Sequence, residues 1–307
     1  MKRQLLVAEF LSTPWALMPE RLNAFAGVIQ RWSAGIPASA EVMTSIQADK
    51  LARDARRDAA GQAQRNNGGD IAVIPLYGVV TQRGSADDVS GSGGASVQKF
   101  TASLRAAIAD PSVSQILIDI DSPGGSVYGV QELAAEILSA RATKPIVAIA
   151  NSLCASAAYW VACSASEVYV TPGGEVGSIG VWQAHQDCSE AMAEAGVKTT
   201  LISAGKFKVE GNPYEALGAE ASAFLQSRVN DYFQAFTKGV SKGRNVSIDA
   251  VRNGMGQGRV LGADAALAEN MVDGIMTFDQ VIKKMQKNSK PNASRLAAMQ
   301  RDVVVLS

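Results

Sequence analysis

The chain has 307 residues, of which 47% are hydrophobic, and its 29 basic side chains balance 29 acidic ones. This length allows a large buried core, and the balanced charge predicts no attraction to nucleic acid or to an anionic membrane. Three cysteines, Cys154, Cys163 and Cys188, lack metal-ligand spacing and indicate small buried thiols in a reducing compartment. With no metal cluster or phosphate-binding glycine motif in the sequence, we expect no cofactor.

The region before residue 71 is expected to be an appendage, with an N-terminal helical arm over 1–48 and a polar linker over 49–70. Apolar residues recur in the arm at helical spacing: Leu22, Phe25, Ile29 and Trp32. Glu9 interrupts a signal-like apolar start, and no stretch is long enough to span a membrane. We therefore expect a soluble, cytoplasmic protein.

From residue 71 onward, strand and helix patterns alternate. Strands are expected over 71–80, 116–120, 146–150, 168–170, 179–181 and 198–202. Helices are expected near 97–108, 130–138, 155–164, 188–195 and 219–240. This order predicts an α/β fold with a mostly parallel sheet and flanking helices, in a domain over 71–286 that a flexible tail over 287–307 follows.

Ligands of open parallel sheets bind beyond the carboxyl ends of the strands, and three segments there are unusual. They read Asp121-Ser-Pro-Gly-Gly-Ser-Val127, Asn151-Ser-Leu-Cys-Ala-Ser-Ala-Ala-Tyr159 and Ser203-Ala-Gly-Lys-Phe-Lys208. The paired glycines of the first can turn N–H groups toward a ligand, although a plain turn uses the same residues. In the second, Ser156 stands at the start of a helix, where most serines are only N-caps.

The third segment offers two lysines, Lys206 and Lys208, and most lysines are simply solvated. A lysine acts as a base near neutral pH only when burial lowers its pKa, and it then needs no carboxylate partner. A Ser-His-Asp site needs such a carboxylate, and nothing in the spacing marks one for the single histidine, His185. His185 is expected to be structural or substrate-adjacent, and a Cys154–His185 pair is the weaker alternative because nothing marks that thiol as activated.

These segments resemble the signal peptide peptidase A family of serine peptidases, which share the Clp-protease and crotonase fold. The resemblance runs in order over about residues 71–280, through the glycine turn, the nucleophile helix, Gly177-Ser-Ile-Gly-Val and the lysine loop. It implies that Ser156 attacks the scissile carbonyl, that Lys208 rather than Lys206 accepts its proton, and that Ser178 steadies the lysine amine. The implied oxyanion donors are the N–H groups of Gly125 and Ala157. Alanines at 157 and 158 depart from the glycines of many members.

Two further segments resemble bacteriophage prohead proteases: the opening Thr13-Pro-Trp-Ala-Leu-Met-Pro-Glu-Arg-Leu, and Gly205 through Glu215. The resemblance implies a Ser-Lys endopeptidase that cleaves phage scaffold, portal or capsid proteins during head maturation. It also implies a homo-oligomer, in which Lys208 acts either within its own chain or, as in some relatives, on a neighbouring subunit. The helices near the N-terminus and over 219–240 are candidate contacts, although packing on the chain's own core explains them equally well. The alternatives are an inactive assembly or scaffolding protein and a crotonase-like acyl-CoA enzyme.

Overall fold

The computed structural model describes residues 13–19, 70–83 and 94–288, together with Thr44, Gln47, Ala48, Leu51 and Ala55. The helix expected over 22–32, most of the linker and the tail beyond Asn288 lie outside the described residues.

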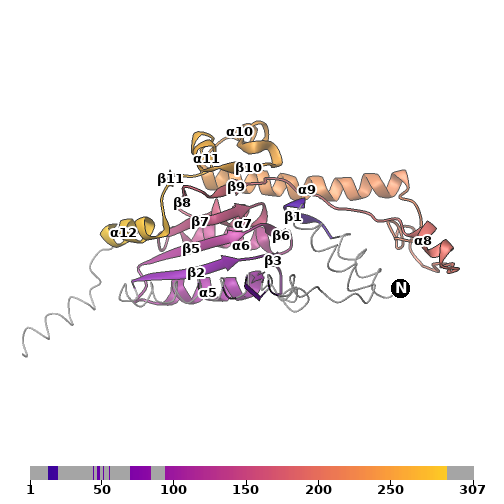
Figure 1. Ribbon diagram of the computed structural model, residues 1–307, viewed down its shortest axis with the longest axis horizontal. Coiled ribbons are helices and arrows are strands. Elements are labelled where there is room, and N and C mark those ends of the chain that lie inside the picture. The colour runs from indigo at the N-terminus through magenta and orange to yellow at the C-terminus, as the bar shows by residue number, and fades with distance from the viewer. Residues whose placement is uncertain are drawn as a thin grey trace, which may run out of the picture.

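A seven-stranded sheet forms the centre of the molecule (Figure 1). Its strands are β2 (Ile71–Tyr77), β5 (Gln115–Ser122), β7 (Ile146–Ala155), β8 (Glu167–Val170), β9 (Glu175–Gly177), β10 (Val260–Gly262) and β11 (Gly274–Ile275). The order is β10-β9-β7-β5-β2, and β8 pairs with the first half of β7 on one edge and with β11 on the other. Every pair is parallel except β10 on β9. The expected mostly parallel α/β fold is confirmed.

Helices cover both faces of this sheet, so successive residues of its central strands are buried on alternate sides. In β2, Ala72, Ile74 and Leu76 join the main core. The helices around that core are α5 (Val97–Ala109), α6 (Val130–Ala140), α7 (Ala157–Ala162) and α9 (Ala219–Arg244). On the opposite face, Ile71 and Val73 pack with residues of α12 (Phe278–Asn288).

The remaining helices are α8 (Ser189–Glu194), α10 (Ile248–Asn253), the 3-10 turn η1 (Met255–Gly258) and α11 (Ala263–Ala268). Within the described residues, none of the helices combines the length and apolar character needed to cross a membrane.

A second, four-stranded sheet lies at the carboxyl end of the large one. Its order is β1 (Trp15–Leu17), β6 (Gly124–Ser126), β3 (Val80–Thr81) and β4 (Ala95–Ser96). A register shift between Ile120 and Ser122 ends the regular pairing of β5 with β7, and the chain then turns into β6. Through the pairing of β1 with β6, residues 15–17 are thereby joined to the segment that follows β5.

Two expected strands are wrong. Residues 179–181 are not a strand, because the preceding strand β9 ends at Gly177 and the chain leaves the sheet there. Residues 198–202 form no strand either and belong to an extended arm over residues 183–218. Residues 198–208 of this arm are all exposed, so their β-branched side chains find no sheet face to cover.

Candidate active site

Ser156 occupies the junction between β7 and α7. Its backbone angles, φ 55° and ψ −118°, are rarely adopted by L residues, and the side chain is buried. Its N–H donates to Gly177 O at 2.6 Å, and its Oγ lies 3.5 Å from Gly180 O. A strained serine at a sharp strand-to-helix turn is the arrangement that exposes a nucleophile in serine hydrolases of another α/β fold.

The helix after Ser156 is buried along its whole length. Tyr159 donates its hydroxyl hydrogen to Met271 O at 2.9 Å, and Trp160 stacks on Phe236 of α9 with ring centroids 4.8 Å apart. Gly239 and Gly243 of α9 allow this close contact, because a Cβ at Gly243 would lie 2.0 Å from Cys163 O. Packing on all sides therefore holds the backbone of the serine in its strained conformation.

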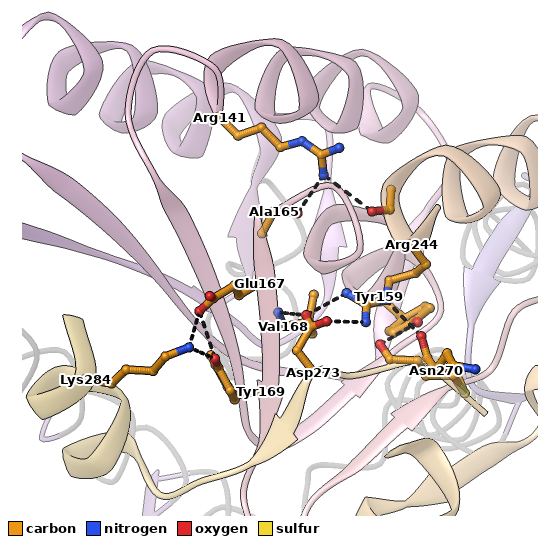
Figure 2. Close-up of polar contacts among 12 residues, drawn as sticks. Arg141, Tyr159, Ala165, Glu167, Val168, Tyr169, Arg244, Asn270, Asp273 and Lys284 are labelled. Atoms are coloured by element: carbon orange, nitrogen blue, oxygen red, sulfur yellow. Dashed lines mark hydrogen bonds and ion pairs between the residues drawn. The ribbon is translucent and has the colours of Figure 1, made fainter. Parts of the chain in front are cut away.

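A polar network ties the end of α9 to the strands beneath α7 (Figure 2). Arg244 donates to both carboxylate oxygens of Asp273 at 2.8 and 2.9 Å, and to Asn270 O at 3.0 Å. Asp273 also accepts the N–H of Val168 at 2.7 Å. Burial acts to raise the pKa of the Asp273 carboxyl, but the hydrogen bonds from Arg244 and Val168 and the Arg244 charge leave it lowered.

The glycine turn lies directly against Ser156. A Cβ added at Gly124 would lie 2.9 Å from the Ser156 Cβ, and one at Gly125 would lie 1.9 Å from Val80 O. Ser122 fixes the start of the turn, since its Oγ donates to Gly78 O at 2.6 Å and accepts the Gly124 N–H at 3.2 Å. Only glycine fits at either position without displacing backbone.

Ser178 follows Gly177, the residue whose carbonyl accepts the Ser156 N–H. It is buried, has a positive φ of 53°, and donates its own N–H to Arg259 O at 2.8 Å. The sequence-predicted residues Ser156, Ala157, Gly125 and Ser178 therefore come together where β6, β7 and β9 end. As the first residue of α7, Ala157 has no acceptor for its N–H within that helix.

Lys208 lies elsewhere in this single chain. It is exposed on the arm over residues 183–218, which carries α8 and projects beyond the sheet toward the far end of α9 (Figure 1). The neighbouring Lys206 forms an ion pair with Glu220 at 3.1 Å. Phe207, which separates the two lysines in the sequence, has a half-exposed side chain. The structure thus assembles the serine side of the expected dyad but does not bring the lysine to it.

The alternative residues lie in other surroundings. His185 lies in the arm over residues 183–218, where its Nε2 is 2.9 Å from Asn212 O. Cys154 is fully buried, and burial raises the pKa of its thiol well above the usual range. A protonated, buried thiol is a poor nucleophile, which disfavours Cys154 as the reactive group.

Sequence reasoning missed one part of the site, the strand β1. Trp15–Leu17 pairs antiparallel with β6, opposite the paired glycines. The signal was a short apolar run, Trp-Ala-Leu-Met, between Pro14 and Pro19, which favours extended backbone over a helix. The resemblance to prohead proteases covered this segment without indicating where it lies.

These parts resemble the nucleophile turn of a serine hydrolase: an α/β core with a strained serine, the buried helix α7 after it and the glycine strand β6 beside it. The chain belongs to Peptidase family S49, whose family model matches residues 139–292.

The chain is 35% identical over 228 residues to capsid assembly protease C of Escherichia phage lambda, covering 74% of this chain and 51% of that protein. It is 36% identical over 207 residues to head-tail preconnector protein GP5 of Enterobacteria phage P21, covering 66% and 41%. The chain therefore spans about half or less of these relatives' length. The solved structure of a mutant of the 1510-N membrane-bound stomatin-specific protease matches with a TM-score of 0.42 and 14% sequence identity. The match covers 70% of this chain and 83% of that chain.

Proposed function

We propose that this chain is a serine endopeptidase in which Ser156 is the nucleophile and Lys208 the general base. The observation that carries the proposal is the strained, buried Ser156 at the start of α7, with the glycine turn and Ser178 beside it. Ser156 Oγ attacks the scissile carbonyl carbon and passes its proton to Lys208, which returns it to the leaving amine. Water then hydrolyses the acyl-enzyme.

The N–H groups of Gly125 and Ala157 stabilise the oxyanion in this mechanism. Both belong to rigid elements, β6 and the buried helix α7, so little reorganisation is needed when charge develops on the substrate oxygen. Ser178 steadies the lysine amine in this mechanism. Its position supports the role, because it follows Gly177, whose carbonyl accepts the Ser156 N–H.

The exposure of Lys208 supports an active site shared between subunits. A lysine becomes a base near neutral pH only in a desolvated setting, and the arm that carries Lys208 is exposed over residues 198–208. In our proposal, assembly into a homo-oligomer covers the arm and delivers Lys208 to Ser156 of a neighbouring copy.

The substrates in this proposal are phage scaffold, portal or capsid proteins, cleaved during head assembly in the host cytoplasm. The support comes from two relatives whose names concern capsid assembly and the head-tail preconnector. The membership of Peptidase family S49 supports peptide-bond cleavage as the reaction.

The test is to incubate the purified chain with candidate head proteins of its phage and to map new termini by mass spectrometry. Ser156→Ala and Lys208→Ala should each lower the cleavage rate by about 10³-fold or more, with unchanged circular dichroism. Lys206→Ala is the matched control, because Lys206 lies on the same loop as Lys208 but pairs with Glu220 of α9, and it should retain cleavage. Cleavage that survives in both Ser156→Ala and Lys208→Ala would end the dyad assignment.

Mixing the two inactive variants tests whether the site is shared. If Lys208 acts on a neighbouring copy, co-assembled Ser156→Ala and Lys208→Ala chains contain some intact sites and regain part of the activity. If Lys208 acts within its own chain, every site lacks one partner and the mixture stays inactive. Labelling of Ser156 by a fluorophosphonate separates both cases from an inactive assembly protein, in which no serine reacts.

A further inference from the structure

The strand β1 lies beside the proposed nucleophile and is held on both edges. On one edge it pairs antiparallel with β6, with Trp15 opposite Ser126, Ala16 opposite Gly125 and Leu17 opposite Gly124. On the other, the Trp15 N–H donates to Trp182 O at 2.8 Å and the Trp182 N–H donates to Trp15 O at 3.0 Å. Many proteins bind peptides in this manner, as an extended segment that pairs with the edge of a sheet.

The register places one carbonyl of β1 at the proposed oxyanion donor. Flanking bonds join Met18 N–H to Pro123 O at 3.2 Å and Val127 N–H to Pro14 O at 3.5 Å. Hydrogen-bonded pairs alternate in an antiparallel ladder, so the pair between these two, Ala16 and Gly125, also exchanges hydrogen bonds. The Ala16 carbonyl therefore accepts the Gly125 N–H.

The same carbonyl lies close to Ser156. A Cβ built on Gly124 would be 2.3 Å from Ala16 O and 2.9 Å from the Ser156 Cβ, so both atoms border one small space. The Ala16 carbonyl is thus bonded to the glycine strand and close to the nucleophile, as the carbonyl of a bound substrate must be.

The side chains of β1 alternate between two environments, as those of a bound strand do. Ala16 is completely buried and belongs to the main core, which also contains Ala157 and Ala158 of α7. Trp15 and Leu17 form a separate cluster with Val79 and Trp182. The position of Ala16 therefore suits a small side chain, whereas its neighbours take large apolar ones.

Resting on the peptidase function proposed above, we propose that Pro14–Leu17 occupies the chain's own peptide-binding site, with the Ala16 carbonyl at the oxyanion position. Substrates bind there as extended strands antiparallel to β6, with a small residue at the Ala16 position. The N-terminal segment acts as an internal competitor that a substrate displaces.

The test measures binding of a fluorescent peptide with the sequence of residues 11–20 by anisotropy. The host is the full chain with Ser156→Ala, which excludes cleavage, and it carries either Ala16→Pro or the matched control Ala16→Gly. Proline removes the N–H that bonds Gly125 and should release β1, whereas glycine keeps the pairing. The peptide should bind the proline variant at least tenfold more tightly. Equal affinities for the two hosts, or no binding to a folded proline variant, would overturn the proposal.

A second variant and a second peptide test the proposal independently of the proline variant. Trp15→Asp places a charge against Val79 and Trp182 and should open the site even if the proline variant does not fold. A peptide with phenylalanine at the Ala16 position should bind at least tenfold more weakly, and equal binding would contradict the small pocket. Because the host lacks the Ser156 hydroxyl, these outcomes are independent of whether the Ser-Lys peptidase assignment holds.

Discussion

Ser156 combines an unfavourable backbone conformation with almost complete burial. Its φ of 55° with ψ of −118° is more easily adopted by glycine than by serine, and such backbone states cost on the order of 1–3 kcal/mol. The chain retains it because α7 is buried on all sides and because the Ser156 N–H is fixed to Gly177 O. This conformation places the Ser156 Cβ beside the glycine turn.

Ser156→Gly should therefore be more stable than Ser156→Ala, by about 1 kcal/mol, since both remove the hydroxyl and only glycine relieves the strain. The measurement is thermal unfolding of the two variants at equal concentration. Ser164 is the control, because it is buried and has no positive φ. There the alanine variant should be the more stable of the two, because glycine makes the unfolded chain more flexible. An alanine variant at 156 that is as stable as the glycine variant would show that no strain is stored there.

At the residue scale, the sequence indicated most of the serine side of the site. Small residues around Ser156 and the paired glycines were visible in the strand-end segments, and the structure brings them together. The strain at Ser156 was not readable, because it depends on the packing of α7 against α9. The location of Lys208 was not readable either, since exposure depends on which surfaces the fold leaves uncovered.

At the scale of elements, the contact between α7 and α9 depends on two glycines that have no role as turns. Gly239 and Gly243 lie one helical turn apart on α9, and their hydrogen atoms face Trp160 and Cys163 of the neighbouring segment. The helical pattern of α9 was readable in the sequence, but this close approach was not. The close approach depends on which face of α9 packs against α7.

Gly243→Ala should destabilise the fold by about 1–3 kcal/mol, because its Cβ would lie 2.0 Å from the Cys163 carbonyl oxygen and must push α9 away from α7. Chemical denaturation measures the change. Gly218→Ala is the control at the start of the same helix, where an added Cβ has no atom within 4 Å. Equal stability of the two variants would show that the helices are free to shift.

The ion pair between Arg244 and Asp273 should make stability depend on pH. The folded pKa of Asp273 is lowered, so its contribution is present above the unfolded pKa of about 4 and is lost as pH falls through the folded value. Asp273→Asn should cost about 1–3 kcal/mol near neutral pH, and less as the pH approaches 3. Unfolding by urea at several pH values measures this. Glu136→Gln, in the exposed pair with Arg105, should change stability little at any of them.

At the scale of the whole molecule, the arm over residues 183–218 is the part for which the sequence predicted the wrong secondary structure. Thr199, Thr200 and Ile202 have the composition of a strand, and a strand requires a neighbour that the described part of this chain does not give them. The large apolar side chains Ile202, Phe207 and Phe224 are exposed along the arm and the adjoining end of α9. A surface of this kind is typical of subunit contacts.

The exposed apolar residues should therefore be needed for assembly. Ile202 is 97% exposed and Phe224 is 49% exposed, so Ile202→Asp and Phe224→Asp disturb no core, but they place charges where a second copy would pack. On the proposed shared active site, we expect both variants to sediment as smaller species than the unmodified chain and to lose cleavage in parallel, because separate copies do not bring Lys208 to Ser156. Leu267→Asp, on α11 and 41% exposed, is the control and should assemble normally. Variants of Ile202 and Phe224 that assemble and cleave normally would show that this surface is not the subunit contact.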